Sequence, residues 1–371
     1  MNIFISVCDY SSELYAYKIL EYIKEEIDGN IFAIGGGLLK DFRGVNFWLD
    51  SVKYSAVGFF ENLPRIPFMF FDYLKLKKLL RSNRIDYAIL FDSPAVNLRL
   101  IRLLRGRGVK IIYIIPPKSW SLERSKVHDF VENNCDVIIV PFKFNLNVYK
   151  GKNVFYFGHP IVEIVKKDLT LENRKSVLGI FPGSRKFEVE FVSKPVLDNV
   201  LSFTKKFQEI FISSTFLTKQ YLRKFNSDIV KVSEDYYEII SKAGVALAVS
   251  GTVVLKNAIY SVPTICFYKV YKISEFIFRK IKKIKVDKIA LPNILWEYEF
   301  KLGNEFIIPE LIQDEYNYLS VVDKLDNILE NYDYYLSKIK EFRKTFFEFY
   351  PPFPLKDISE FLLGFMKKGK R

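Results

Sequence analysis

The stretch VLGIFPGSRKFEVE at residues 177–190 decides the fold class, because an apolar run ends in a small polar loop that opens a helical pattern. Short apolar runs that alternate with longer amphipathic segments are typical of parallel strands covered by helices. The pattern recurs along the chain and predicts further strands at 2–7, 30–34, 86–91, 109–115, 136–142, 153–157, 209–213, 244–249 and 263–268. The sequence therefore predicts an α/β protein with parallel sheets.

The chain length predicts two domains. The 371 residues exceed the roughly 250 to 300 that one hydrophobic core usually organises. A polar stretch at 164–176 interrupts the strand rhythm, so we expect Rossmann-like doubly wound domains at 1–165 and 166–349. Pro351, Pro352 and Pro354 break the tail into two helices, and we expect the second, at about 350–371, to pack back onto the first domain.

Composition narrows the function classes. An excess of 56 Lys and Arg over 43 Asp and Glu gives a net charge of +13, which attracts nucleic acid, anionic lipid or phosphorylated substrates. The three cysteines, Cys8, Cys135 and Cys266, are widely spaced in apolar stretches and predict neither a disulfide framework nor a zinc site. No apolar run approaches the roughly 18 residues of a spanning helix, and the N-terminus does not resemble a signal peptide. We therefore expect a cytoplasmic protein.

Loops that follow strands are the places to look for a site, because the carboxyl ends of parallel strands share one edge of a sheet. Five such loops are rich in small or polar residues: CDYSSE (8–13), GGG (35–37), DSPAVN (92–97), PGSRKFEVE (182–190) and SGT (250–252).

Two of these loops predict a phosphate site. Gly183 and Ser184 allow close backbone approach and Arg185 can pair with a diphosphate, although a plain turn with a solvated arginine fits equally well. In SGT, Ser250, Gly251 and Thr252 open the next helix, where an anion or an ordinary N-cap are the alternatives. Two such loops in the same half of the chain favour the diphosphate.

The first half offers candidates for acid–base chemistry. Asp92 follows an apolar strand and is predicted either as a general base or as the cap of the next helix. Glu61 is similarly ambiguous. Of the two histidines, His128 is expected at the surface, whereas His159 follows a strand and is more often structural than catalytic in such a place.

Two basic stretches carry exposed-looking aromatic and aliphatic residues. The first, residues 57–84, combines aromatic and apolar residues with basic ones: Phe59, Phe60, Phe68, Met69, Phe70 and Phe71 with Lys75, Lys77, Lys78, Arg81 and Arg84. The second, residues 268–288, carries Ile and Phe at helical spacing among many Lys. Such stretches suit an anionic membrane surface, and ordinary amphipathic helices are the alternative.

Taken in order, FGHPIVE (157–163), FPGSRKFEVE (181–190), ALPNIL (290–295) and IPELIQ (308–313), together with AVGFFE and DSPAVN, resemble the lipid-A-disaccharide synthase family, inverting glycosyltransferases of GT-B fold. The resemblance implies two Rossmann-like domains facing a central cleft. It places the proposed base on Asp92 and a first-loop serine on Ser11. Together with Glu61, these two residues form the expected catalytic group. The positions implied on the nucleotide side are Gly183, Ser184, Arg185, Ser250, Gly251, Thr252, Asn293, Gln313 and Glu310.

The resemblance also implies the reaction partners: UDP-2,3-diacylglucosamine as donor, 2,3-diacylglucosamine 1-phosphate as acceptor, no cofactor and no metal. The enzyme would be peripheral on the inner face of the bacterial inner membrane, and a homodimer is compatible with the sequence. Several positions depart from the family pattern. The first loop reads CDYSSE at 8–13 where the family usually has Gly-Glu-Thr-Ser-Gly-Asp, Ala95 and Lys256 replace acids, and Leu122 replaces a tryptophan. The alternatives are a UDP-N-acetylglucosamine 2-epimerase, a muramyl-pentapeptide N-acetylglucosaminyltransferase or a basic nucleic-acid-binding protein, although no nucleic-acid module is visible and no nucleic-acid partner is expected.

Overall fold

The computed structural model describes residues 1–371 except 53–65, 173, 217, 273–274, 276–287 and 370–371. Glu61 and most of the second basic stretch lie outside the described residues, as do the side chains of residues 66–69. Contacts within the chain separate two compact units, which we describe one at a time. Unit 1 runs to Val165 and takes in Tyr350–Arg371, and unit 2 is Lys166–Phe349.

The described part of unit 1 contains a seven-stranded parallel sheet in the order β3-β2-β1-β4-β5-β6-β7. Its strands are β1 (Ile3–Ser6), β2 (Ile31–Gly35), β3 (Val45–Asp50), β4 (Tyr87–Phe91), β5 (Lys110–Ile114), β6 (Val137–Val140) and β7 (Val154–Tyr156). The order reverses between β1 and β4, the switch point at which open α/β sheets bind ligands. All the predicted strands of this half are present. β3 was not predicted.

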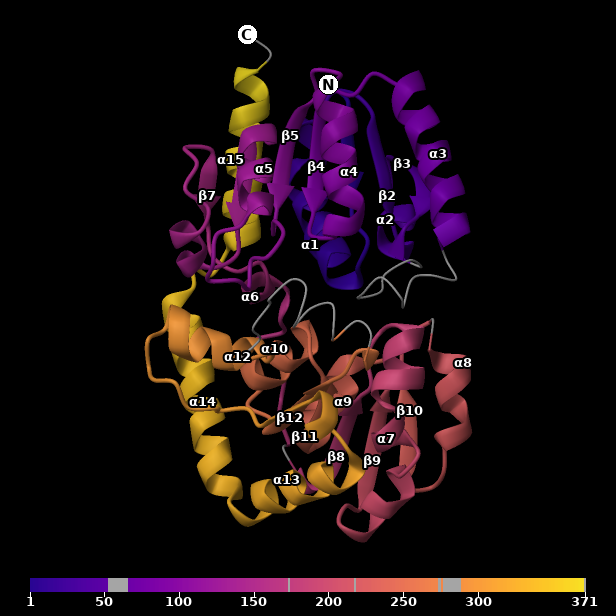
Figure 1. Ribbon diagram of the computed structural model, residues 1–371, viewed down its shortest axis with the longest axis vertical. Helices are drawn as coiled ribbons and strands as arrows, with labels where there is room; N and C mark the ends of the chain where they lie inside the picture. The colour runs from indigo at the N-terminus through magenta and orange to yellow at the C-terminus, as the bar shows by residue number, and fades with distance from the viewer. Residues whose placement is uncertain (53–65, 173, 217, 273–274, 276–287, 370–371) are drawn as a thin grey trace. The chain divides into compact units, whose positions relative to one another are not determined.

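Helices cover both faces of this sheet (Figure 1). They are α1 (Tyr10–Ile23), α2 (Gly37–Asp41), α3 (Ile66–Ser82), α4 (Pro94–Arg105), α5 (Lys126–Asn134), α6 (Ile161–Ile164) and α15 (Pro354–Lys368). Successive side chains of a strand point to opposite faces, so Ile3 and Ile5 pack with α1 and α15, whereas Phe4 packs with α3 and α4. Two apolar layers therefore sandwich the sheet.

Unit 2 has a parallel sheet of six strands within the described residues, in the order β10-β9-β8-β11-β12-β13. The strands are β8 (Arg174–Phe181), β9 (Glu209–Ser213), β10 (Val230–Ser233), β11 (Ala243–Val249), β12 (Thr264–Tyr268) and β13 (Glu310–Ile312). Here the order reverses between β8 and β11, the two strands that end in the PGSR and SGT loops. Both units are thus Rossmann-like.

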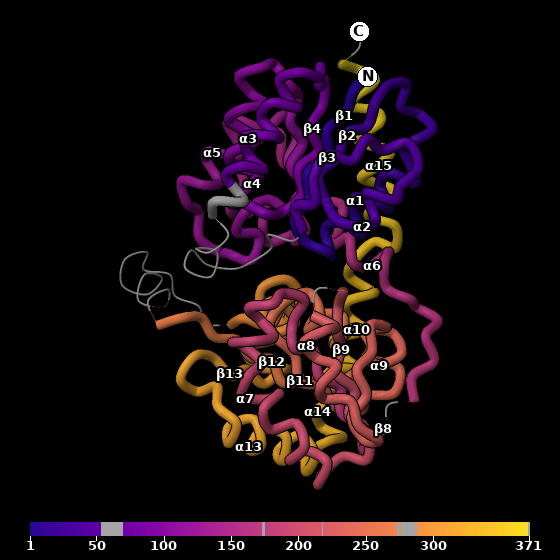
Figure 2. Tube along the Cα trace, turned by 90° about the vertical axis from the view of Figure 1, so that its right-hand side faces the viewer, coloured from indigo at the N-terminus to yellow at the C-terminus, as the bar shows by residue number. Residues whose placement is uncertain are grey.

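The helices of unit 2 are α7 (Lys194–Leu197), α8 (Lys219–Leu222), α9 (Tyr236–Lys242), α10 (Thr252–Ile259), α12 (Leu291–Ile294), α13 (Tyr318–Glu330) and α14 (Tyr332–Phe349). Figure 2 shows the Cα trace of this unit after a turn of 90° about the vertical axis. The segment after PGSR is helical, as predicted, but it consists of a π-helical turn at Glu188–Val192 and the short helix α7. Ser193 lies between the two and donates its hydroxyl proton to the carbonyl of Pro182. None of the helices in the described ranges is both long and apolar enough to cross a bilayer.

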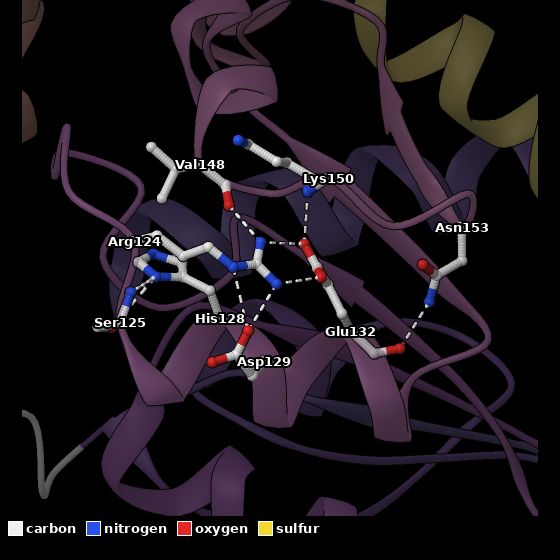
Figure 3. Close-up of polar contacts among 8 residues, drawn as sticks. All are labelled: Arg124, Ser125, His128, Asp129, Glu132, Val148, Lys150 and Asn153. Atoms are coloured by element: carbon white, nitrogen blue, oxygen red, sulfur yellow. Dashed lines mark hydrogen bonds and ion pairs between the residues drawn. The ribbon is translucent and has the colours of Figure 1, made fainter.

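The prediction that His128 lies at the surface was also wrong. The imidazole is buried under the ring of Tyr149, at a centroid distance of 4.6 Å, and its Nδ1 accepts the backbone N–H of Ser125 at 2.8 Å. Arg124 joins Glu132 at 2.7 Å beside it (Figure 3). Acidic residues of this segment form ion pairs with Arg124, whereas His128 is buried and caps the start of α5.

Candidate functional site

The loop that carries Asp92 has an unusual backbone. Asp92 and Ser93 follow β4 with φ values of 38° and 47°, the left-handed region that non-glycine residues seldom adopt. The Asp92 carbonyl accepts hydrogen bonds from Asn97 Nδ2 at 2.8 Å and from the Tyr113 hydroxyl at 2.6 Å. Asn97 is fully buried and is oriented by Ser6, whose hydroxyl donates to its Oδ1 at 2.7 Å. The N-cap of α4 is Ser93, so the structure does not place Asp92 at the cap.

Backbone strain is concentrated at this edge of the sheet. Ile115, which follows the neighbouring β5, also has a positive φ of 55°. A left-handed β-branched residue is costly, and such conformations persist where surrounding contacts enforce them, often at functional sites. The geometry therefore supports Asp92 as a positioned group at the switch point of unit 1.

The first loop lies on the adjacent strand. Ser11 is half-buried in the first turn of α1, and Asp9 caps that helix by accepting the N–H of Ser12 at 2.9 Å. Glu13 is buried, and its carboxylate accepts the N–H groups of Gly36 at 2.7 Å and Leu39 at 3.0 Å. Glu13 therefore ties the GGG loop to the first loop, a role that the sequence pattern around it does not predict.

Cys8 follows β1 and is buried near Ser51, after β3, and Ser93, after β4. Burial is the main cause that raises the pKa of its thiol to about 12, whereas the two serine side chains act in the opposite direction. A thiol with this pKa stays protonated, so Cys8 is a packing group and not a nucleophile. Cys135 and Cys266 are likewise buried and free.

In unit 2 the PGSR loop folds around a carboxylate of its own. Glu188 is buried, and its Oε2 accepts the N–H groups of Ser184 at 2.9 Å and Arg185 at 3.2 Å. Its Oε1 pairs with the Arg185 guanidinium at 2.7 Å. Gly183 has φ +101°, and a Cβ there would lie 2.4 Å from the Cβ of Glu188, so only glycine fits. The arginine is thus held in place and not free in solvent.

The SGT loop opens α10, as predicted. Thr252 is the first helical residue and Gly251 the N-cap, without a side-chain cap, so the first N–H groups of the helix keep the polarity that favours an anion. Ser250 donates its hydroxyl proton to the carbonyl of Ile289 at 2.8 Å.

Two of the other residues predicted to bind the nucleotide hold the backbone around Ile289. The Glu310 carboxylate accepts the N–H groups of Ile289 at 2.7 Å and Ala290 at 3.0 Å, and burial raises its pKa. Asn293 is fully buried, donates to Glu310 at 2.7 Å and accepts the N–H of Ile308. Ser250, Glu310 and Asn293 therefore stabilise the same short segment, Ile289 and Ala290, which precedes α12.

Gln313, which follows β13 with φ 55°, accepts the N–H of Val270 at 2.7 Å. It ties the end of β13 to the segment after β12, beside the loop that the previous residues hold.

His159 is structural in this fold. It is 5% exposed, its Nδ1 accepts the N–H of Ile161 at 3.1 Å, and burial lowers its pKa to about 3. A neutral imidazole that caps α6 agrees with the structural alternative. In the described part of the chain, no three His, Cys, Asp or Glu side chains gather as metal ligands would.

Comparison with known proteins decides the family. A family model described as lipid-A-disaccharide synthetase matches residues 3–348. The chain belongs to this family. It is 33% identical over 330 residues to a lipid-A-disaccharide synthase of Aquifex aeolicus, covering 84% of this chain and 86% of the relative. A relative of the same description from a Sulfurihydrogenibium species is 28% identical, with 90% of each chain covered.

Solved structures agree on the fold. A UDP-GlcNAc 2-epimerase from Neisseria meningitidis matches with a TM-score of 0.62, 12% identity and coverage of 98% of this chain and 100% of that one. The MurG protein of Acinetobacter baumannii matches with a TM-score of 0.56, 12% identity and coverage of 97% and 98%. These likenesses show the GT-B class of paired Rossmann-like domains. Membership of the family makes this chain a glycosyltransferase of lipid A biosynthesis, as the resemblance implied.

Proposed function

We propose that this chain transfers the diacylglucosamine unit of UDP-2,3-diacylglucosamine to the 6-hydroxyl of 2,3-diacylglucosamine 1-phosphate. The hydroxyl oxygen forms a bond to the anomeric carbon as the bond from that carbon to UDP breaks, with inversion to a β(1→6) link. The electron pair of the broken bond leaves with UDP. The family match over nearly the whole chain carries this proposal.

Asp92 is the base we propose for the hydroxyl proton. A general base must be held within hydrogen-bond reach of its proton, and the clamp on the Asp92 backbone by Asn97 and Tyr113 supplies such positioning. Ser11, in the first turn of α1, is proposed to contact the acceptor from the adjacent strand end. Glu61 remains a proposed third member of the group. Unit 1 would then bind the acceptor.

Unit 2 is the proposed site of the UDP-sugar. Arg185 and the start of α10 would hold the diphosphate as negative charge develops on the leaving UDP. The Glu188 carboxylate, which now accepts the amides of Ser184 and Arg185, would keep the loop and the guanidinium in one geometry. Ser250, Asn293, Glu310 and Gln313 would shape the neighbouring loop for the nucleotide.

Membrane docking is proposed at α3. Phe70 and Phe71 are 57% and 68% exposed, Leu74 is also exposed, and the helix buries Leu76 and Leu80 on its other side. Lys75, Lys78 and Arg81 are exposed on the same helix. Apolar contact plus about 1 kcal/mol for each basic residue near anionic lipid would give reversible binding. We place the enzyme on the inner face of the inner membrane, where its acylated substrates would lie, and a homodimer stays a prediction for sedimentation analysis.

A product assay tests the proposed function. The purified full-length chain is incubated with both acylated substrates in detergent micelles. Mass spectrometry should find one product whose mass is the sum of the donor and acceptor masses minus the mass of UDP. NMR should assign its new anomeric centre as β. Conversion of UDP-N-acetylglucosamine to its 2-epimer without any acylated acceptor, and no disaccharide, would contradict the proposal.

A further inference from the structure

A lysine in unit 2 lies on an aromatic surface next to the proposed diphosphate site. The Lys256 ammonium is 3.5 Å from the ring centroid of Tyr236 and 5.1 Å from that of Tyr237. Tyr236 begins α9 and its ring packs against Phe181, at a centroid distance of 5.5 Å. Phe181 is the last residue of β8, directly before the PGSR loop. The ammonium therefore lies at the carboxyl edge of the sheet.

Helix geometry also directs this lysine toward the helix start. Lys256 is four residues after Thr252, so both lie on one face of α10. Side chains on an α-helix lean toward its N-terminus. The Lys256 chain consequently extends toward the end of α10 that the SGT loop opens.

Lys256 makes no ion pair with any of the described residues. The carboxylate of Asp235 is nearby and accepts the N–H of Tyr237 at 2.8 Å. Burial is the main cause that lowers the pKa of Lys256 to about 8, with Asp235 acting in the opposite direction. A half-buried cation that lies on aromatic rings gains from the arrival of an anionic ligand.

The residues around Lys256 offer hydrogen-bond donors and a second positive charge. Asn257 is fully buried, and its Oδ1 accepts the Tyr236 hydroxyl at 3.0 Å, but its Nδ2 has no partner in the described structure. A second ammonium, that of Lys166, is 4.2 Å from the Tyr237 ring. The cluster of Lys166, Tyr236, Tyr237, Lys256 and Asn257 is therefore rich in donors and positive charge.

We propose that Lys256 is a specificity-determining contact for the diphosphate of the nucleotide-sugar donor, a second cation in addition to Arg185. The inference rests on the proposed nucleotide site of unit 2. The aromatic rings hold the ammonium in one place before the ligand arrives, so that the diphosphate meets a charge already stripped of much of its water.

Calorimetric titration of the full chain with UDP, UMP and uridine tests this. Lys256→Met should weaken UDP binding about tenfold or more, the scale of a charge-assisted hydrogen bond, and uridine binding less than twofold. Lys175→Met is the matched control, because Lys175 also lies over a tyrosine ring, Tyr332 at 5.2 Å, but at the amino end of β8. It should bind all three ligands as the wild type does.

Lys256→Arg, which keeps the charge, should retain most of the preference for UDP over uridine, and this variant serves if Lys256→Met does not fold. Equal affinity of wild type and Lys256→Met for UDP, or an equal loss for all three ligands, would overturn the inference alone. Loss confined to discrimination between UDP and its 2′-deoxy analogue would assign Lys256 to ribose and also overturn it. A wild type that binds none of the ligands would instead contradict the proposed nucleotide site.

Discussion

Glu163 lies 2.8 Å from the backbone nitrogen of Leu355, 192 residues further along the chain, and accepts its hydrogen bond. The same carboxylate oxygen accepts the N–H of Lys356, and the other oxygen accepts the Tyr22 hydroxyl. Helix α15 has no side-chain cap at Phe353, so Glu163 satisfies N–H groups of its first turn from a distant segment. This contact attaches the C-terminal helix to the rest of unit 1.

Glu163→Ala should loosen the start of α15. Loss of a cap costs roughly 0.5 to 2 kcal/mol, so amide hydrogen exchange at residues 355–358 should speed up about tenfold. The control is Glu21→Ala, which removes an exposed carboxylate paired with Lys18 on α1. Unchanged exchange in the Glu163 variant would show that apolar packing alone holds the helix.

Asp92→Asn should lower turnover by about a hundredfold or more while the UDP dissociation constant stays unchanged, because it removes the proposed base and no phosphate contact. Asp86 precedes the same strand at its amino end and pairs with Arg84, so Asp86→Asn is the matched control and should keep normal turnover. Near-normal activity of the Asp92 variant would exclude it as the base.

Arg185→Ala should weaken UDP binding about tenfold or more and leave uridine binding nearly unchanged, because the guanidinium is proposed to contact only the diphosphate. The neighbouring Lys186→Ala removes an exposed cation that faces Glu190 and should bind UDP normally. If both variants bind UDP like the wild type, the Arg185–Glu188 pair is purely structural.

His159 should make the stability of the chain sensitive to acid. Its pKa of about 3 in the folded chain lies below the ordinary value of 6.5, so the unfolded chain takes up a proton first as the pH falls. Its contribution is complete above about pH 6.5 and is lost progressively toward pH 3, at about 1.4 kcal/mol per pH unit.

Urea denaturation at several pH values measures this effect. His159→Asn keeps an acceptor for the N–H of Ile161 and cannot be protonated, so its free energy of unfolding should fall less steeply below pH 6. Parallel pH curves for the two proteins would contradict a buried neutral histidine.

The double substitution of Phe70 and Phe71 by Ser should weaken binding to anionic vesicles several-fold. It should not change the melting temperature, because both side chains are exposed on α3. Phe216→Ser is the control, since Phe216 is 92% exposed and belongs to unit 2, whereas α3 belongs to unit 1. Vesicle sedimentation at low and high salt measures binding. Undiminished binding by the double variant would place docking elsewhere, with residues 268–288 as the next candidate.

The strands that could be predicted from sequence share one physical property. β1, β4, β11 and the second half of β8 are almost continuous apolar runs because both of their faces are covered. The three strands that were missed, β3, β10 and β13, lie at sheet edges and are half-exposed or very short. An edge strand needs fewer apolar residues and so leaves a weaker pattern.

The candidate site divides in the same manner. The loops at Asp92, Arg185 and Thr252 could be located, because strand ends and small residues are local signals. The residues that hold these loops could not be located from sequence. Asn97 and Glu188 are polar residues in helical segments, and only the folded backbone shows that they bond to the loops.

The sequence by itself determined the α/β class, the loops of the candidate site and the family, because apolar periodicity and motif order are properties of the chain read along its length. Only the tertiary structure decided that His128 is buried, that Glu163 caps a helix 192 residues away and that Lys256 rests on Tyr236. A buried polar group must be satisfied by whichever partner the sheet order and helix packing bring within reach, and that choice is made in space and not along the chain.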